Sequence, residues 1–154
     1  MHKLFLMLIG IFLLSCSSDR LFEDYHALED NVWHEDSIQR FELEVEDTSS
    51  FYQINFHLRH TADYDYRNLF VFVDVLFPDK RGLRDTMNIM LADPSGRWYG
   101  DGVGALKSVV VPFRSGLKFP LQGKYIFEFN HGMRETELKS IQDIGLEIVR
   151  LSKE

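Results

Sequence analysis

The feature that most constrains the fold is a strict two-residue alternation of apolar and polar side chains in two neighbouring segments. Residues 41–46 read Phe-Glu-Leu-Glu-Val-Glu, and residues 52–59 read Tyr-Gln-Ile-Asn-Phe-His-Leu-Arg. Successive side chains of a strand point to opposite faces, so the pattern predicts two half-buried strands, the first with Phe41, Leu43 and Val45 inside. The polar residues 47–50 between them are typical of a turn. We therefore expect the two strands to form a hairpin.

The rest of the chain continues as short apolar segments separated by turn signals. Residues 69–77 are almost continuously apolar, which predicts a central strand buried on both faces. Only residues 133–141 have a pattern that could hold a short helix. The further strands are expected within 83–91, 109–113, 123–130 and 144–151. Seven or eight such strands predict an all-β fold, a single antiparallel β-sandwich of the immunoglobulin-like or jelly-roll kind.

The N-terminal residues follow the pattern of a lipoprotein signal peptide. A basic start at Lys3 precedes 11 apolar residues, 4–14, fewer than the roughly 20 that a membrane-spanning helix needs. Leu13-Leu14-Ser15-Cys16 then matches a lipobox, in which the chain is cut before the cysteine and its sulfur is diacylated. Cys16 is the only cysteine of the chain, so it has no disulfide partner, and lipidation gives it a role. We expect the lipid on Cys16 to hold the protein on a membrane that it does not span.

This interpretation divides the chain into three parts. Residues 1–15 are the signal peptide, residues 16–36 are a lipid-anchored tether and edge segment, and residues 37–154 are the β-sandwich domain. No aspartate directly follows Cys16, so the inner-membrane retention signal known in enterobacteria is absent. That favours the outer membrane. The choice between its periplasmic face and the cell surface stays open.

The charge of the mature chain argues against two classes of partner. Removing residues 1–15 takes away only one charged side chain, so 16 basic and 24 acidic residues remain and the net charge is −8. Nucleic acid is a poor candidate because phosphate binding needs a cationic surface. Direct docking on anionic lipid headgroups is unfavourable for the same reason.

Each candidate for chemistry or binding is weak when it is weighed against a structural role. His57 and His60 are three apart, a spacing that puts strand residues on opposite faces, so we expect surface histidines and no metal pair. The glycine-rich segment 96–104 lacks the Gly-Lys-Ser/Thr end of a phosphate loop. Within it, Trp98 and Tyr99 are candidate binding residues, or else core aromatics at a strand end.

The carboxylates are equally unspecific. Glu42, Glu44 and Glu46 should form one solvated row on a sheet face. Asp63 and Asp65 could ligate calcium, but their loop lacks the glycine and the twelfth-position glutamate of an EF-hand. We therefore expect no catalytic residue, no metal site and no cofactor.

Several strings in a fixed order, none of them a catalytic signature, point to a known family. They are Trp33-His34-Glu35-Asp36-Ser37, residues 64–70, residues 91–98 with the glycines that follow, Gly123-Lys124-Tyr125, Met133-Arg134 and residues 141–148. In these strings and in its lipobox, the chain resembles the gliding motility lipoprotein family GldH of Bacteroidetes. The resemblance implies an outer-membrane-associated lipoprotein that gliding species require for motility. It also implies a setting among gliding and type IX secretion proteins of the envelope, and it supplies no catalytic residues.

Three functions are compatible with these observations. The first is a non-enzymatic envelope protein that acts as a component or accessory of the gliding motility or type IX secretion apparatus. The second is a surface carbohydrate-binding lipoprotein, which an exposed planar row of aromatic side chains would favour. The third is an envelope hydrolase, which would need a cleft with converging carboxylates or a perturbed histidine.

Overall fold

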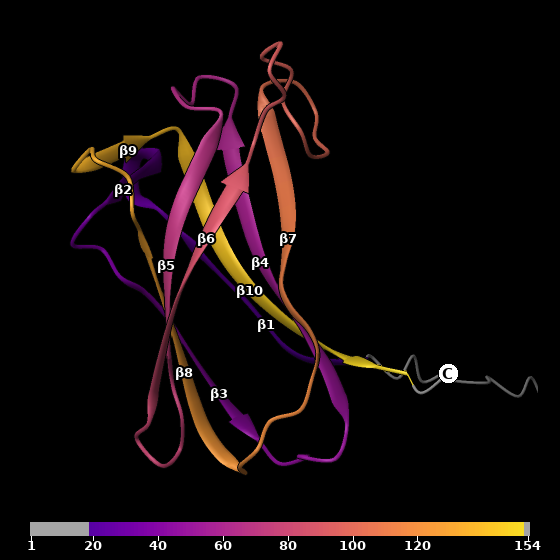
Figure 1. Cartoon of the computed structure of the whole chain (residues 1–154). Helices are drawn as coiled ribbons and strands as arrows, with labels where there is room; N and C mark the ends of the chain where they lie inside the picture. The colour runs from indigo at the N-terminus through magenta and orange to yellow at the C-terminus, as the bar shows by residue number, and fades with distance from the viewer. Residues whose placement is uncertain (1–18, 153–154) are drawn as a thin grey trace, which may run out of the picture.

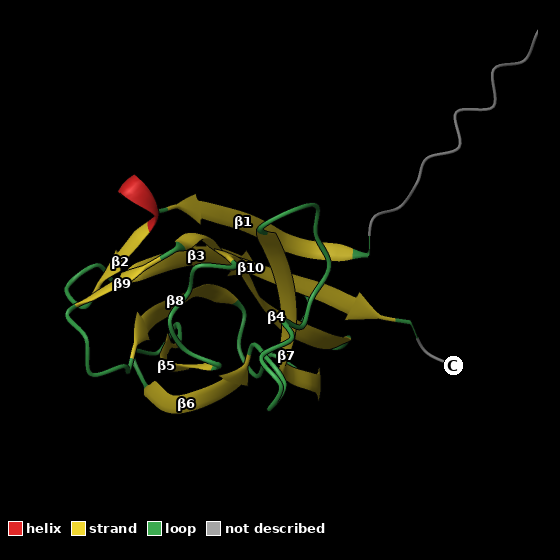
Figure 2. Cartoon of the chain, turned by 90° about the horizontal axis from the view of Figure 1, so that it is seen from above, coloured by secondary structure: helices red, strands yellow, loops and turns green. Residues whose placement is uncertain are grey.

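Two antiparallel four-stranded sheets face each other in the computed structural model, which describes residues 19–152 (Figure 1). In the view from above, the strands of the two sheets run down the picture side by side, β1, β10, β4 and β7 on the right and β3, β8, β5 and β6 to their left (Figure 2). Sheet I has the strand order β1-β10-β4-β7, and sheet II has the order β3-β8-β5-β6. A two-stranded ribbon, β2 with β9, lies at one end of the sandwich. The strands are β1 (Arg20–Ala27), β2 (Val32–His34), β3 (Gln39–Val45), β4 (Phe51–Thr61), β5 (Asn68–Leu76), β6 (Gly82–Met90), β7 (Leu106–Leu117), β8 (Gly123–His131), β9 (Glu137–Lys139) and β10 (Ile141–Leu151).

The core lies between the sheets and is built by the inward residues of the alternating strands. In β3 every second residue is buried, and β4 and β5 follow the same alternation over most of their length. Phe56 of sheet I contacts Phe129 of sheet II with ring centroids 5.1 Å apart, and Phe129 also meets Phe41 at 5.8 Å. These rings belong to a larger buried apolar cluster, whose removal from water is the main stabilising contribution of the sandwich. The expected all-β sandwich is therefore confirmed.

The expected hairpin of the first two alternating strands is wrong. β3 pairs with β8 in sheet II, whereas β4 pairs with β10 and β7 in sheet I. The turn between them therefore crosses from one layer to the other, and Asp47 organises it by accepting hydrogen bonds from the backbone N–H groups of Ser49 and Ser50. The alternation specifies only which face of each strand is apolar, and in a sandwich the opposite sheet covers that face. It therefore does not decide which strand is the hydrogen-bonded neighbour.

The expectation for residues 69–77 is only half right. β5 is an interior strand of sheet II, between β8 and β6, but its buried and exposed residues alternate. Phe70 is 38% exposed and Phe72 is 42% exposed on the outer face of the sheet. Unlike a parallel sheet, an antiparallel sheet can leave one face in water, so a continuous apolar run does not require two covered faces.

The described residues contain ten strands where seven or eight were expected. The additions are the short ribbon strands β2 and β9, each three residues long. β9 occupies the segment for which a short helix was considered, and the only helical element of residues 19–152 is one 3₁₀ turn, Glu29–Asn31. Pairing between Trp33 and Leu138 overrides the weak helical periodicity there, because both side chains are buried. Residues 19–152 include no helix of sufficient length and apolar character to cross a membrane.

Candidate functional site

The candidate binding pair Trp98 and Tyr99 lies in the connection between β6 and β7. The Trp98 ring is partly buried, with its centroid 4.9 Å from that of His60 and 6.5 Å from that of Tyr64. Tyr99 is 44% exposed. Trp98 thus packs at the end of the core, and Tyr99 is the member of the pair that solvent reaches. Cys16, the expected lipidation site, lies outside the described residues.

The glycine-rich segment around this pair is a loop packed against β7. Asp101 and Ser108 exchange two backbone hydrogen bonds, of 3.0 and 2.7 Å. A Cβ atom on Gly100 would lie 2.3 Å from the carbonyl oxygen of Ser108, and Gly100 has a φ of +86°. Glycine is needed here because the two backbones approach closely. The segment is therefore built for packing on β7, in agreement with its missing phosphate-loop signature.

The histidines divide between the two faces of the sandwich. His57 points outward and His60 inward from β4, as the spacing predicts. The expectation of a surface histidine is wrong for His60, which is 0% exposed. His131 of β8, which was not singled out from the sequence, is also buried and is 3% exposed. Burial lowers the pKa of both imidazoles below the ordinary histidine value. Nδ1 of His60 lies 3.0 Å from the carbonyl oxygen of Thr61, and its Nε2 has no hydrogen-bond partner within residues 19–152.

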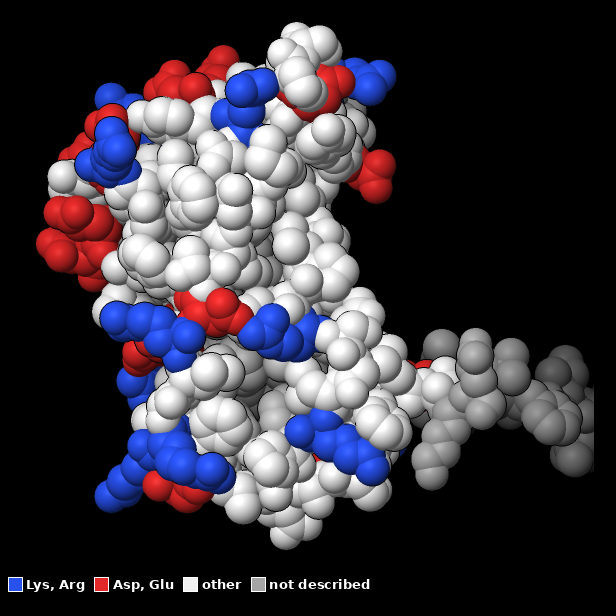
Figure 3. All heavy atoms as spheres, in the orientation of Figure 1, with Lys and Arg blue, Asp and Glu red and all other residues white. Residues whose placement is uncertain are grey.

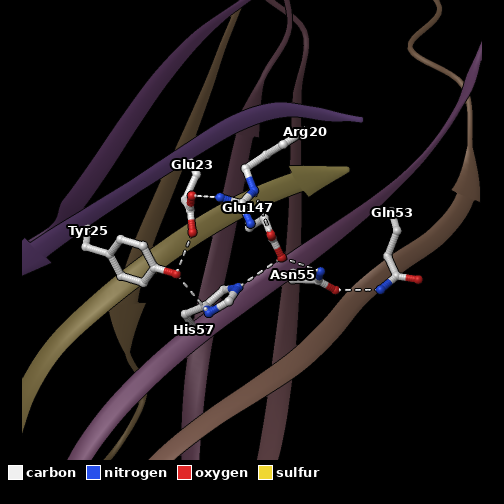
Figure 4. A network of polar contacts seen from close by, with 7 residues as sticks. All are labelled: Arg20, Glu23, Tyr25, Gln53, Asn55, His57 and Glu147. Carbon is white, nitrogen blue, oxygen red and sulfur yellow. Dashed lines mark hydrogen bonds and ion pairs between the residues drawn. The ribbon is translucent and has the colours of Figure 1, made fainter. Parts of the chain in front are cut away.

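A connected network of polar side chains lies on the outer face of sheet I (Figure 4). At its centre, Tyr25 of β1, His57 of β4 and Glu147 of β10 come together from three adjacent strands. The Tyr25 hydroxyl oxygen is 3.2 Å from Nδ1 of His57, and Nε2 of His57 is 3.2 Å from a carboxylate oxygen of Glu147. We name the whole set the polar cluster: Arg20, Glu23, Tyr25, Gln53, Asn55, His57 and Glu147.

Gly145 allows the polar cluster to form. It lies on β10 between Tyr25 and His57 in the strand register. A Cβ atom on Gly145 would lie 2.4 Å from the Tyr25 ring, so the ring crosses β10 directly over this glycine. A glycine inside a strand often marks such a close approach. Gly145 inside an apolar strand was the one signal in the sequence that could have pointed to this cluster, which sequence reasoning missed.

The electrostatics of the cluster fix the protonation of two groups. Burial raises the pKa of Glu147, but hydrogen bonds from Asn55 and His57 outweigh it and hold that pKa below the usual range. Arg20 Nε adds an ion pair at 3.1 Å. Burial, helped by a hydrogen bond to Glu23, raises the pKa of Tyr25 to about 12. Glu147 is therefore an anion and Tyr25 a neutral donor at neutral pH.

The arrangement is suited to joining strands. The Tyr25 hydroxyl donates to Glu23, while Glu147 already accepts hydrogen bonds from two side chains in addition to its ion pair. A carboxylate satisfied in this way has little free capacity to act as a base. In residues 19–152 there is no set of three or more His, Cys, Asp or Glu side chains arranged to hold a metal ion. The polar cluster thus links β1, β10 and β4 on a solvent-facing surface.

The row of glutamates on β3 takes the predicted position. Glu42 and Glu44 are exposed on the outer face of sheet II, and Glu46 is exposed just after the strand. Glu42 pairs with Arg40 at 2.9 Å and with Lys124 at 2.9 Å. These ion pairs place basic side chains among the glutamates, so the surface along the row carries both positive and negative charge.

Two solved structures that align with most of this chain have low identity and low TM-scores. A match to an arabinose-bound α-L-arabinofuranosidase has 10% identity and a TM-score of 0.38, and it covers 84% of this chain and 23% of that one. A match to a structure of infectious bursal disease virus has 11% identity and a TM-score of 0.35, covering 87% of this chain and 32% of that one.

Sequence relatives match over nearly the whole chain. The Gliding motility lipoprotein GldH homolog of Christiangramia forsetii is 31% identical over 159 residues, covering 96% of this chain and 97% of that protein. The Gliding motility lipoprotein GldH of Flavobacterium johnsoniae is 31% identical over 150 residues, covering 93% and 92%. The family model described as GldH lipoprotein matches residues 20–148, from the start of β1 into β10. This chain therefore belongs to the GldH lipoprotein family.

Proposed function

We propose that this protein is a lipid-anchored, non-enzymatic protein of the cell envelope that serves the gliding motility or type IX secretion apparatus as a component or accessory. The observation that carries the proposal is the match of residues 20–148 to the family, with relatives of nearly equal length named for gliding motility. In this proposal the lipid on Cys16 anchors the protein to the outer membrane, and the sandwich makes contacts with other envelope proteins.

The polar cluster supports a non-enzymatic role. Its central groups are satisfied by one another, with Glu147 bound to Asn55 and His57 and the Tyr25 hydroxyl bound to Glu23. Catalysis needs acid or base groups that are free to hydrogen-bond to a substrate and exchange a proton with it. In the polar cluster, the hydrogen-bond donors and acceptors are instead used to link neighbouring strands.

The test is affinity purification of the tagged protein from gently solubilised envelopes, with mass spectrometry of the proteins that accompany it. We expect gliding or type IX secretion proteins to be recovered, and to be lost when the tagged protein is denatured beforehand. Expression in a Flavobacterium johnsoniae strain that lacks its own GldH gives a second readout, the spreading of colonies. Recovery of the protein alone, together with failure to restore spreading, would contradict the proposal.

One observation favours a second function, carbohydrate binding. Phe70 and Phe72 lie two residues apart on the outer face of β5 and are both more than a third exposed. Aromatic rings in such a row can stack on sugar rings. A glycan-binding screen tests this function, with a Phe70→Ala/Phe72→Ala double variant as the control. Binding that the double variant retains would exclude the row as its cause.

A further inference from the structure

The sandwich is open along one side, where β6 of sheet II and β7 of sheet I are both edge strands (Figures 1 and 2). Leu83 shows this opening most clearly. It pairs in register with Val75, which is 6% exposed in the core row, yet Leu83 itself is 46% exposed. Among the strands of residues 19–152, none lies beside β6 on this edge to cover it. Because the register of β6 turns Leu83 toward the core, its exposure is due to the position of β6 at the edge of the sheet.

An apolar hollow lies behind this opening, and we name it the β6–β7 slot. Its volume is about 190 Å³, and its apolar lining includes Leu83, Phe113, Leu117 and Phe119. The front face of the molecule is hollowed in this region, between β6 and β7 (Figure 3). A cavity of about 150 Å³ in a protein can hold a benzene ring. The slot is therefore large enough for one large apolar side chain.

The charged residues that line the slot favour an acidic ligand. Arg114 and Lys118, its two charged lining residues, are both basic, although the chain has a net charge of −7. Arg114 forms an ion pair with Asp85 of β6. Lys118 Nζ lies 4.6 Å from the centroid of the Phe51 ring, and among residues 19–152 no carboxylate lies within ion-pair distance of it. A carboxylate from outside would complement Lys118.

β6 is the edge strand that is most open to pairing. β7 has Pro112, which lacks an N–H group, and its register with β4 is irregular, while β1 has a register shift at its start. The edge strand β3 carries alternating charges on its outer face. β6 pairs with β5 over nine residues without a shift and contains no proline. Its charged side chains, Arg84 and Asp85, are both neutralised within the protein, by Asp74 of β5 and Arg114 of β7. Bulges, prolines and charges are the features that protect edge strands from added strands.

We propose that β6 and the β6–β7 slot bind an extended segment of a partner protein, which adds a fifth strand to sheet II. The segment inserts one large apolar side chain beside Leu83 and places a carboxylate against Lys118. Main-chain hydrogen bonds to β6 supply the pairing, and the slot supplies selectivity for an apolar and acidic sequence. This inference goes beyond the proposed function because it requires no role in gliding, and the experiment below can fail while the gliding role stands.

The test starts from a displayed library of random nine-residue peptides, selected on the purified protein. We expect the recovered peptides to alternate apolar and polar residues and to contain aspartate or glutamate. Leu83→Glu and Lys118→Glu should each weaken their binding at least about ten-fold. The matched controls Met90→Glu, at an exposed outward position of β6, and Lys139→Glu, on β9, should change binding less than about two-fold. Thermal melts establish that each variant is folded.

Synthetic peptides with N-methyl groups then test the strand pairing itself. An added strand donates only alternate N–H groups to the edge that it joins. Methylation of one alternate set of nitrogens should therefore abolish binding, and methylation of the other set should leave it unchanged. The proposal is overturned if no peptide is recovered, if both methylated sets bind alike, or if Leu83→Glu and Lys118→Glu bind as the unmodified protein does. Sedimentation that shows dimers lost in Leu83→Glu would instead assign the edge to a second copy of this chain.

Discussion

Acid should destabilise this protein in the range where histidine titrates, because two imidazoles are buried in the sandwich. His60 is 0% exposed and His131 is 3% exposed, and burial lowers the pKa of each. In the unfolded chain a histidine has a pKa of about 6.5. Below that pH the unfolded state binds protons that the folded state does not, so stability is complete above pH 6.5 and falls as the pH drops.

The size of the effect follows from the number of buried rings. Each group that protonates only when unfolded changes the free energy of unfolding by about 1.4 kcal/mol per pH unit. From pH 7.5 to pH 5.5 one such histidine removes up to about 1.4 kcal/mol, so His60 and His131 together remove up to about 2.7 kcal/mol. Carboxylates such as Glu147, whose pKa is lowered, lose their contribution to the free energy of unfolding at lower pH. Between pH 7.5 and pH 5.5 the change in stability therefore comes from the histidines.

Urea unfolding at both pH values measures this drop. His60→Leu and His131→Leu should each remove about half of it, and the double variant should have nearly the same free energy of unfolding at the two pH values. His34→Gln is the matched control, because the His34 side chain is 53% exposed. A double variant that loses as much stability between pH 7.5 and pH 5.5 as the unmodified protein would refute the reasoning.

Three further predictions concern the anchor, the polar cluster and the core. Cys16→Ala should release the protein from the membrane fraction, as measured by fractionation and acyl labelling; a variant that remains bound and acylated elsewhere would contradict the lipobox. Gly145→Ala should cost about 1–3 kcal/mol in urea unfolding, because its methyl group would displace the Tyr25 ring from His57. An unchanged urea midpoint would show that the ring does not lie across β10. Phe56→Ala should cost about 3–5 kcal/mol by the same assay, since the ring is 0% exposed and contacts the other sheet; a loss below 1 kcal/mol would mean that the core collapses into the space.

The local alternation in the sequence determined which faces of the strands are buried. Phe41, Leu43 and Val45 were predicted to point inward and do so, and His57 and His60 lie on opposite faces. The period of two acts within each strand, so neighbouring residues are sufficient to specify it. The family resemblance was also readable in order along the chain, and the relatives confirm it.

Strand partners and contacts between distant residues were not readable in this way. The hairpin prediction for β3 and β4 failed because alternation specifies the apolar face of a strand and leaves its hydrogen-bonded neighbour undetermined. Tyr25, His57 and Glu147 are brought together only by the pairing of β1, β10 and β4, three strands far apart in the sequence.

The sequence by itself thus determined the class of fold, the family and the inward face of most strands. Only the tertiary structure decided the assembly of the polar cluster, the burial of His60 and His131, and the open side between β6 and β7. The physical reason is range: side-chain alternation is a property of adjacent residues, whereas pairing, burial and exposed edges depend on which segments meet once the chain has folded.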